Sequence, residues 1–137
     1  MHEKISKFLH SQHLASICVL HKNLPYSFSA FYAYDDDTKS IIFASDTNTT
    51  HTKAFLSTPK VSATIALNTL KVAKIQGVQI LGIVNSANEI QKECYYRAFA
   101  FSKTLNPTLW ACKIKWIKYT DNTLGFGKKI IWENEKL

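Results

Sequence analysis

Strand-like segments joined by very short connections are the feature that most limits how this chain can fold. The clearest segment is residues 109–121, where Trp110, Cys112, Ile114 and Trp116 fall on one face and lysines alternate with them on the other. Such alternation is typical of a strand with one buried face in an antiparallel sheet. Most of the connections are too short for the crossover helices that parallel strands need. The pattern therefore predicts a mainly β (α+β) fold, in which an antiparallel barrel carries packed helices.

Six to seven strands are expected from this pattern. The predicted strands are residues 13–21, 26–34, 40–45, 60–67, 75–87, 109–121 and 128–132. Within the second of these, Phe28, Ala30 and Tyr32 share one face and alternate with Ser27, Ser29 and Phe31 on the other. This alternation is typical of a strand.

Glycines, prolines and acidic residues mark the expected breaks between strands. Pro25 fixes a backbone angle in a predicted turn at "NLP", and the run Asp35–Asp37 is expected to be a solvated turn. Gly77 and Gly82 are expected to mark bulges or places where two backbones approach closely.

Two or three helices are predicted, at residues 3–13, 46–58 and 87–105. The second begins in a cluster of Thr, Asn and Asp residues suited to an N-cap, and Pro59 ends it. The third has apolar residues at helical spacing, which predicts a buried face. The members of that face are Ile90, Cys94, Ala98 and Phe101, with Tyr95 and Phe99 beside them.

Composition narrows the class of protein. The chain has 137 residues, enough for a single domain over residues 1–137 with its own core, and no apolar run long enough to span a bilayer. Its three cysteines, Cys18, Cys94 and Cys112, are far apart, which favours reduced thiols in a cytoplasmic protein. No membrane association is expected.

A net charge of +7 permits a polyanionic partner. The lysines are scattered, however, and Arg97 is the only arginine, whereas readers of base sequence rely on arginine. Nucleic acid is therefore an unlikely partner, and a phosphorylated small molecule suits the charge better.

The familiar nucleotide, metal and hydrolase motifs are absent, and the five histidines lack metal-ligand spacing. One candidate site is the start of the second helix, where Thr49, Thr50, His51 and Lys53 could bind an anion at a helix N-terminus. An ordinary capped helix explains the same residues equally well. The segment "LGFGKK" also has two interpretations, because its lysines could either reach a phosphate or form the polar start of a strand.

Several longer stretches together resemble a known family. They are "IKYTDNTLGFGKKIIW", "SAFYAYD", "IQGVQILG" and Trp110 within "PTLWACKIKWIKYTD". In this order they look like the FMN-binding split β-barrel of the pyridoxamine 5'-phosphate oxidase-like superfamily, and most of all like its small YhbP-type branch. The resemblance covers nearly the whole chain.

The resemblance implies a homodimer with two FMN molecules at the subunit interface. It places the flavin ring against residues 27–32, and Ala44 and Ser45 near the ring edge or ribityl chain. It places the phosphate near the start of the second helix, where Thr50 and His51 stand in place of the family's arginine–lysine pair and Lys53 lies one helical step further on. The implied cofactor-binding residues are Ser29, Ala30, Phe31, Tyr32, Ala44, Ser45, Thr49, Thr50, His51, Lys53, Gln76, Gly77, Trp110, Lys128 and Lys129.

In these implied roles, Gln76 and Gly77 match a strand that contacts flavin, and Trp110 matches a tryptophan that reaches the cofactor from the other subunit. The segment with Lys128 and Lys129 would close over the site across the dimer. Thr123 and its neighbours replace the arginine and histidine that bind substrate in the true oxidase, so this chain is not expected to be one.

The resulting hypothesis is an FMN-dependent reductase or oxidase, with NAD(P)H as a candidate reductant and Tyr32 as the one candidate acid or base. Two alternatives remain open at this point. One is a non-enzymatic protein that binds flavin or haem, and the other is a basic barrel that binds nucleic acid.

Overall fold

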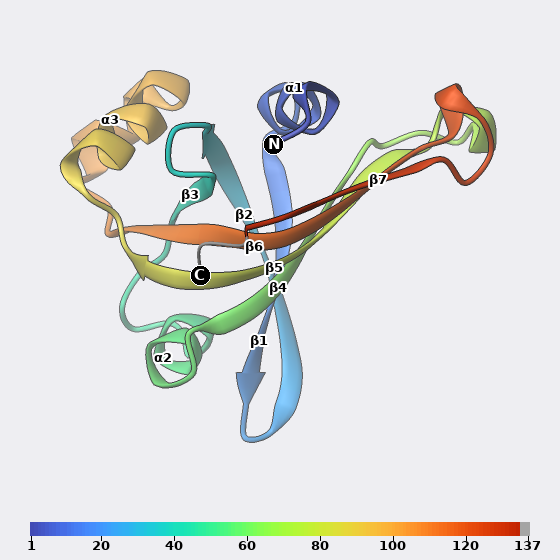
Figure 1. Cartoon of the computed structure of the whole chain (residues 1–137). Helices are drawn as coiled ribbons and strands as arrows, with labels where there is room; N and C mark the ends of the chain where they lie inside the picture. The colour runs from blue at the N-terminus through green and yellow to red at the C-terminus, as the bar shows by residue number, and fades with distance from the viewer. Residues whose placement is uncertain (135–137) are drawn as a thin grey trace.

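The computed structural model describes residues 1–134 and contains one seven-stranded antiparallel sheet, in the order β3-β2-β1-β4-β5-β6-β7. Pairing of β3 with β6 closes the first six strands into a barrel (Figure 1), which confirms the predicted fold class. The strands are β1 (Leu14–His21), β2 (Leu24–Asp35), β3 (Ser40–Ala44), β4 (Lys60–Ala66), β5 (Gln76–Ser86), β6 (Leu109–Asp121) and β7 (Lys129–Glu133). The helices are α1 (Glu3–Ser11), α2 (Thr50–Ser57) and α3 (Glu89–Ala98), with short 3-10 turns η1 (Val72–Lys74), η2 (Ala100–Leu105) and η3 (Asn122–Leu124).

Strand β6 is long enough for two partners to share one of its edges. Its first residues, from Leu109 to Lys113, pair with β3, and its later residues, from Trp116 to Thr120, pair with β7. Between these two stretches β6 has a bulge, since Leu81 of β5 pairs with Trp116 and the next residue, Gly82, pairs with Ile114. The pairing of β6 with β3 therefore ends at the bulge, and the pairing of β6 with β7 begins beyond it.

The bulge corrects the predicted face of Trp116. An extra residue in one strand shifts the side-chain alternation by one position. After Ile114, the fully buried positions of β6 are Ile117 and Tyr119, whereas Trp116 is half-buried on the outer face. Trp110, Cys112 and Ile114 do point into the barrel, as predicted.

The alternation predicted for β2 is confirmed, and the structure shows which of its faces is the inner one. Phe28, Ala30 and Tyr32 all pack against the main core, while Ser29 and Phe31 face outward. Helix α1 covers one end of the barrel (Figure 1) with Ile5, Phe8 and Leu9, all buried, as its helical spacing predicts.

Two local predictions are wrong for physical reasons. The β1–β2 turn is made by Lys22 and Asn23, both at positive φ (52° and 63°), and Pro25 already lies in β2. A two-residue turn of this kind matches the twist of the strands it joins. In the third helix, the buried side chains are Gln91 and Tyr95, so the predicted face is turned outward, with Ile90 66% exposed and Ala98 also exposed. Phe101 is 79% exposed because α3 ends at Ala98 and the helical spacing does not continue into η2.

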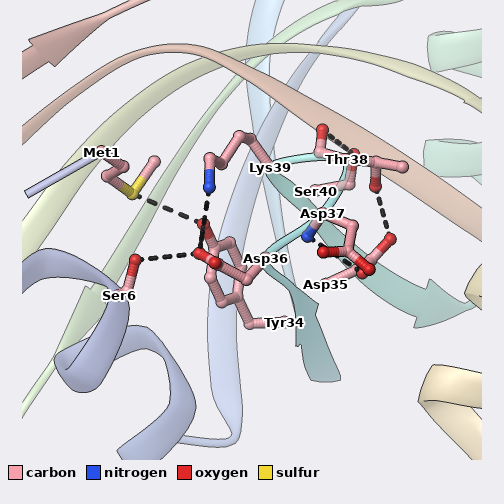
Figure 2. Close-up of polar contacts among 9 residues, drawn as sticks. All are labelled: Met1, Ser6, Tyr34, Asp35, Asp36, Asp37, Thr38, Lys39 and Ser40. Carbon is pink, nitrogen blue, oxygen red and sulfur yellow. Dashed lines mark hydrogen bonds and ion pairs between the residues drawn. The ribbon is translucent and has the colours of Figure 1, made fainter. Parts of the chain in front are cut away.

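The acidic run enters a turn in which Asp36 and Asp37 are exposed, as predicted, and only Asp35, at the end of β2, departs from the prediction (Figure 2). Asp35 is buried and accepts hydrogen bonds from the Asp37 amide and the Thr38 hydroxyl. Asp36 accepts from Ser6 of α1 at 2.9 Å and pairs with Lys39 at 3.2 Å. Burial alone would raise the pKa of Asp36, but these hydrogen bonds outweigh it and hold the pKa below its usual value.

No helix among residues 1–134 has both the length and the apolar character needed to cross a membrane. The three cysteines are free, with Cys112 fully buried and Cys18 and Cys94 half-buried. Burial raises the pKa of the Cys112 thiol to about 12, so this thiol stays protonated and unreactive at neutral pH.

Candidate functional site

The start of α2 gathers hydroxyl groups and one imidazole where β3 ends. Thr49 is the N-cap, and its Oγ1 accepts a hydrogen bond from the Thr52 amide at 3.2 Å. Ser45, just after β3, lies with its Oγ within hydrogen-bond distance of both Thr49 and Thr52. We call Ser45, Thr49, His51 and Thr52 the hydroxyl–imidazole cluster.

His51 is fixed within this cluster from two sides. Its Nε2 lies 2.7 Å from Ser45 Oγ, and its ring stacks on Phe28 of β2 with centroids 3.7 Å apart and an interplanar angle of 9°. Desolvation lowers the pKa of His51, so the ring is neutral at physiological pH and can either give or accept one hydrogen bond at Nε2. A neutral imidazole offers no permanent charge to a phosphate, unlike the lysine or arginine expected there from the family pattern.

Trp110 joins the same region from β6. Its Nε1 donates to the backbone carbonyl of Ser45 at 2.9 Å, and its ring packs edge-on against Phe55 of α2 at 5.0 Å. The side chain is only 6% exposed. Within one chain, Trp110 therefore supports the position of Ser45 and presents little surface to a ligand.

Two hollows divide the predicted residues of β3 and α2 between them. The first lies beside the end of β3, has a volume of about 330 Å³, and is lined by Ala44, Ser45 and the acidic Asp46 together with residues 105–108. The second has a volume of about 410 Å³ and is lined by Thr50 and Lys53 of α2 together with His21 and Lys22 of the β1–β2 turn. No carboxylate lines the second hollow, which we call the α2 hollow.

The predicted residues of β2 are split between its two faces by strand alternation. Ser29 and Phe31 are exposed on the outer face, and Phe31 is 55% exposed. Ala30 and Tyr32 face the core, where the Tyr32 hydroxyl donates to the Leu9 carbonyl at 2.7 Å. Burial raises the pKa of Tyr32 well above its ordinary value, so its hydroxyl is not available as an acid or base.

The remaining predicted residues lie away from α2 within one chain. Gln76 begins β5, where its Oε1 accepts from the Tyr119 hydroxyl at 3.1 Å, and Gly77 pairs with Ala66 at the end of β4. Lys128 and Lys129 lie on the β6–β7 hairpin, which projects from the barrel far from α2 (Figure 1).

The glycines on either side of Phe126 allow the backbone to turn in this hairpin. Gly125 and Gly127 both have positive φ (124° and 71°), and the Lys128 amide donates to the Gly125 carbonyl at 3.0 Å. Asn122 ties the turn to the β4–β5 connection, because its side-chain amide donates to the Val72 carbonyl at 2.9 Å. The segment is therefore a braced hairpin, and its lysines are exposed at the start of β7.

Sequence reasoning missed Phe28 and Thr52 as parts of the site. Alternation placed Phe28 correctly inside, but its stack with His51 depends on how α2 packs against β2. Thr52 is fully buried although it is polar, and only its hydrogen bonds to neighbouring hydroxyl groups explain this. Among the described residues, no three His, Cys, Asp or Glu side chains come together as a metal site.

No protein-family model matches the chain, but several sequence relatives do. A UPF0306 protein of Cronobacter sakazakii is 36% identical over 134 residues, which are 95% of this chain and 93% of that protein. A UPF0306 protein of Yersinia pseudotuberculosis is 30% identical over 132 residues, which are 93% of this chain and 90% of that protein. The chain belongs to the UPF0306 family.

Solved structures of low sequence identity share the fold of this UPF0306 protein. A Clostridium acetobutylicum protein of the pyridoxinephosphate oxidase family, related to general stress protein 26, has a TM-score of 0.71 at 11% identity and covers 98% of this chain and 94% of its own. A FAD-binding protein of Mesorhizobium loti has a TM-score of 0.71 at 13% identity, and the match covers 84% of this chain and 88% of that protein.

A haem-binding protein of Mycobacterium smegmatis has a TM-score of 0.74 at 12% identity and covers 90% of this chain and 53% of its own. At such identities these likenesses establish the fold alone. The fold is thus shared by proteins that hold different cofactors.

Proposed function

We propose that this UPF0306 protein binds FMN and acts as a flavin-dependent oxidoreductase of the cytoplasm, with NAD(P)H as its reductant. The observation that carries the proposal is the α2 hollow, where Lys22 and Lys53 from two different elements converge with the Thr50 hydroxyl. The folds shared with a FAD-binding protein and with a protein of the pyridoxinephosphate oxidase family support the choice of cofactor class.

The α2 hollow suits the phosphate group of FMN. Lys53 lies on the first turn of α2, where the helix dipole also favours an anion, and Lys22 approaches from the β1–β2 turn. Because no carboxylate lines the hollow, a phosphate there would meet two positive charges without a competing negative one.

A second copy of the chain would complete the site. Gln76 and the Lys128–Lys129 pair lie on parts of the barrel remote from α2, so one chain cannot bring both sets to one flavin (Figure 1). In a homodimer, the projecting hairpin of one copy could reach the cofactor held at α2 of the other. A bound flavin would supply the redox chemistry, and the protein's part is to bind and orient it.

The first test is the visible spectrum of the purified protein, followed by chromatography of whatever heat releases and titration with added FMN. A flavin spectrum, or saturable FMN binding by colourless protein, is the expected result. Bleaching of the bound flavin by NAD(P)H would then support an enzyme over a carrier. A colourless protein that ignores added FMN would reject the proposal.

Two lysine variants test where the phosphate group of FMN binds. Lys53→Ala removes one of the two cations of the α2 hollow and should weaken FMN binding by about tenfold, which corresponds to about 1.4 kcal/mol. The matched control is Lys92→Ala, a lysine of α3 that pairs with Glu89 and lines neither the α2 hollow nor the hollow beside Ala44. Equal affinities of the two variants in a flavin titration would remove Lys53 from the site.

A haem-binding function is the second candidate, because the haem-binding protein of Mycobacterium smegmatis has the same fold. The same purification separates the two candidates. A haem spectrum with no released flavin would favour a non-enzymatic haem protein.

A further inference from the structure

An apolar groove crosses the outer face of β1, β4 and β5, on strands that lie side by side in the barrel (Figure 1). Its volume is about 450 Å³, within the usual range of about 300–1,000 Å³ for small-molecule sites. We call it the outer groove. The residues that define it here are Leu20, Pro25, Lys60, Ser62, Leu81 and Lys115.

The groove exists because small side chains lie between large ones across the strands. Cys18 of β1 pairs with Ser62 of β4, and Ser62 pairs with Leu81 of β5. Cys18 and Ser62 are short, whereas Leu20 and Leu81 stand beside them at 46% and 52% exposure. Exposed apolar side chains that enclose a depression are typical of a binding surface.

Positive charge borders this apolar surface. Lys60 begins β4, and Lys115 occupies the bulge of β6, so the two lysines reach the groove from different strands. Lys113 is exposed nearby, paired in register with Ile83 of the groove wall.

Few negative charges face these lysines. The ion pairs found among residues 1–134 join Lys39 to Asp36 and Lys92 to Glu89, and neither involves the groove. The one carboxylate in an adjoining hollow is Glu133, which shares that hollow with Lys115 and Trp116. Among residues 1–134, the lining of the groove therefore includes two lysines and no carboxylate beside its apolar side chains.

We propose that the outer groove binds a free aliphatic carboxylate, with the tail over Leu20 and Leu81 and the carboxylate at Lys60 and Lys115. An amphipathic monoanion matches both properties of the groove, since its tail is removed from water and its head meets two lysines that form no ion pair with a carboxylate among residues 1–134. This site is separate from the proposed flavin phosphate site and does not depend on flavin binding. The two hollows share only Leu20.

Calorimetric titration with decanoate, below its micelle concentration, tests the proposal. Binding should tighten by up to about fourfold for each methylene from octanoate to dodecanoate, because each methylene buries more apolar surface. Decanol, which has the same tail without the charge, should bind at least fivefold more weakly. Equal binding of decanol and decanoate would overturn the role of the lysines.

Lysine variants give the matched comparison. The double variant Lys60→Gln/Lys115→Gln should bind decanoate at least tenfold more weakly than the wild type. The control is Lys118→Gln, which removes a half-buried lysine of β6 that lines neither the groove nor the adjoining hollow. The control should bind within twofold of the wild type, and an equal loss in both proteins would contradict the proposal.

A measurement on the wild-type protein guards against variants that fail to fold. Cys18 lines the groove and is half-buried, so bound decanoate should slow its reaction with a thiol reagent, while Cys94 on α3 should react at an unchanged rate. A second copy of the chain is the competing occupant. If decanoate neither binds nor protects Cys18, and Ser62→Phe turns a dimer into monomers, the groove is a subunit interface and the proposal is wrong.

Discussion

At the scale of single residues, His51 is the side chain whose behaviour most depends on its surroundings. Phe28 covers one face of its ring, and Ser45 holds its Nε2. Desolvation places its pKa in the native protein below the ordinary value of about 6.5. In the unfolded chain the same ring is solvated and titrates near that ordinary value.

This difference predicts a pH dependence of stability. Between the two pKa values the unfolded chain binds a proton that the native protein does not, so the free energy of unfolding should fall as pH drops below about 6.5. His51→Gln should remove part of that slope. Urea unfolding of both proteins between pH 8 and pH 5 measures the effect, and identical slopes would show that His51 titrates normally.

Trp110 gives a second prediction at this scale. Trp110→Phe removes the donor to the Ser45 carbonyl and leaves a buried acceptor unpaired, which should cost about 2–3 kcal/mol of stability. Trp116→Phe on the outer face is the control and should cost less than about 1 kcal/mol. Similar losses in thermal unfolding would show that the Trp110 hydrogen bond contributes little.

At the scale of elements, the bulge of β6 decides which side chains enter the barrel. It shifts Trp116 outward and places Lys115 at the rim of the outer groove. Gly82 lies opposite, where a Cβ atom would come 2.6 Å from Cys112 Sγ and 2.7 Å from the Lys113 carbonyl oxygen. The glycine therefore permits the close approach of β5 and β6 at this point.

Gly82→Ala should destabilise the protein by about 1–3 kcal/mol, because the buried neighbours must move. Gly77→Ala on the same strand is the control. The nearest atom to its added Cβ would be the Ile65 carbonyl oxygen at 3.2 Å, so the loss should stay below about 1 kcal/mol. If chemical denaturation gives Gly82→Ala the stability of the wild type, the strands must be able to separate locally.

At the scale of the whole molecule, the separation of α2 from the β6–β7 hairpin makes flavin binding depend on assembly. If each site uses α2 of one copy and the hairpin of another, dilution below the dimer dissociation constant should release FMN. Flavin fluorescence and sedimentation, followed over the same dilution series, measure both events. Retention of FMN by monomers would reject a shared site.

Mixing variants tests the same prediction directly. Lys53→Ala changes the α2 end, and the double change Lys128→Ala/Lys129→Ala alters the hairpin. A mixed dimer contains one chain of each variant. Because each site combines α2 of one chain with the hairpin of the other, one site of this dimer carries all three substitutions and the other site carries none. A random mixture should therefore recover about a quarter of the wild-type binding sites, as expected for a two-fold symmetric dimer. No recovery would mean that both ends act within one chain.

Prediction from the sequence succeeded where local pattern and global fold agree. Alternation in β2 and β6 gave the barrel strands and most inward residues, and the Thr49 cap and Pro59 bounded α2 closely. It failed at Trp116, Ile90 and Phe101. A bulge moved Trp116 outward, an early helix end exposed Phe101, and α3 packs through Gln91 and Tyr95 rather than through Ile90. The amino-acid pattern alone does not reveal these changes.

The sequence by itself determined the antiparallel strands, the capped start of α2 and the membership of the family, since these depend on residue types at short spacing. Tertiary structure alone decided which of the candidate residues meet. It stacked His51 on Phe28, buried Tyr32 against Leu9 and placed the β6–β7 hairpin far from α2 (Figure 1). These contacts join residues distant in the sequence, and their geometry comes from barrel closure between β3 and β6 and from the packing of α1 and α2 on the barrel.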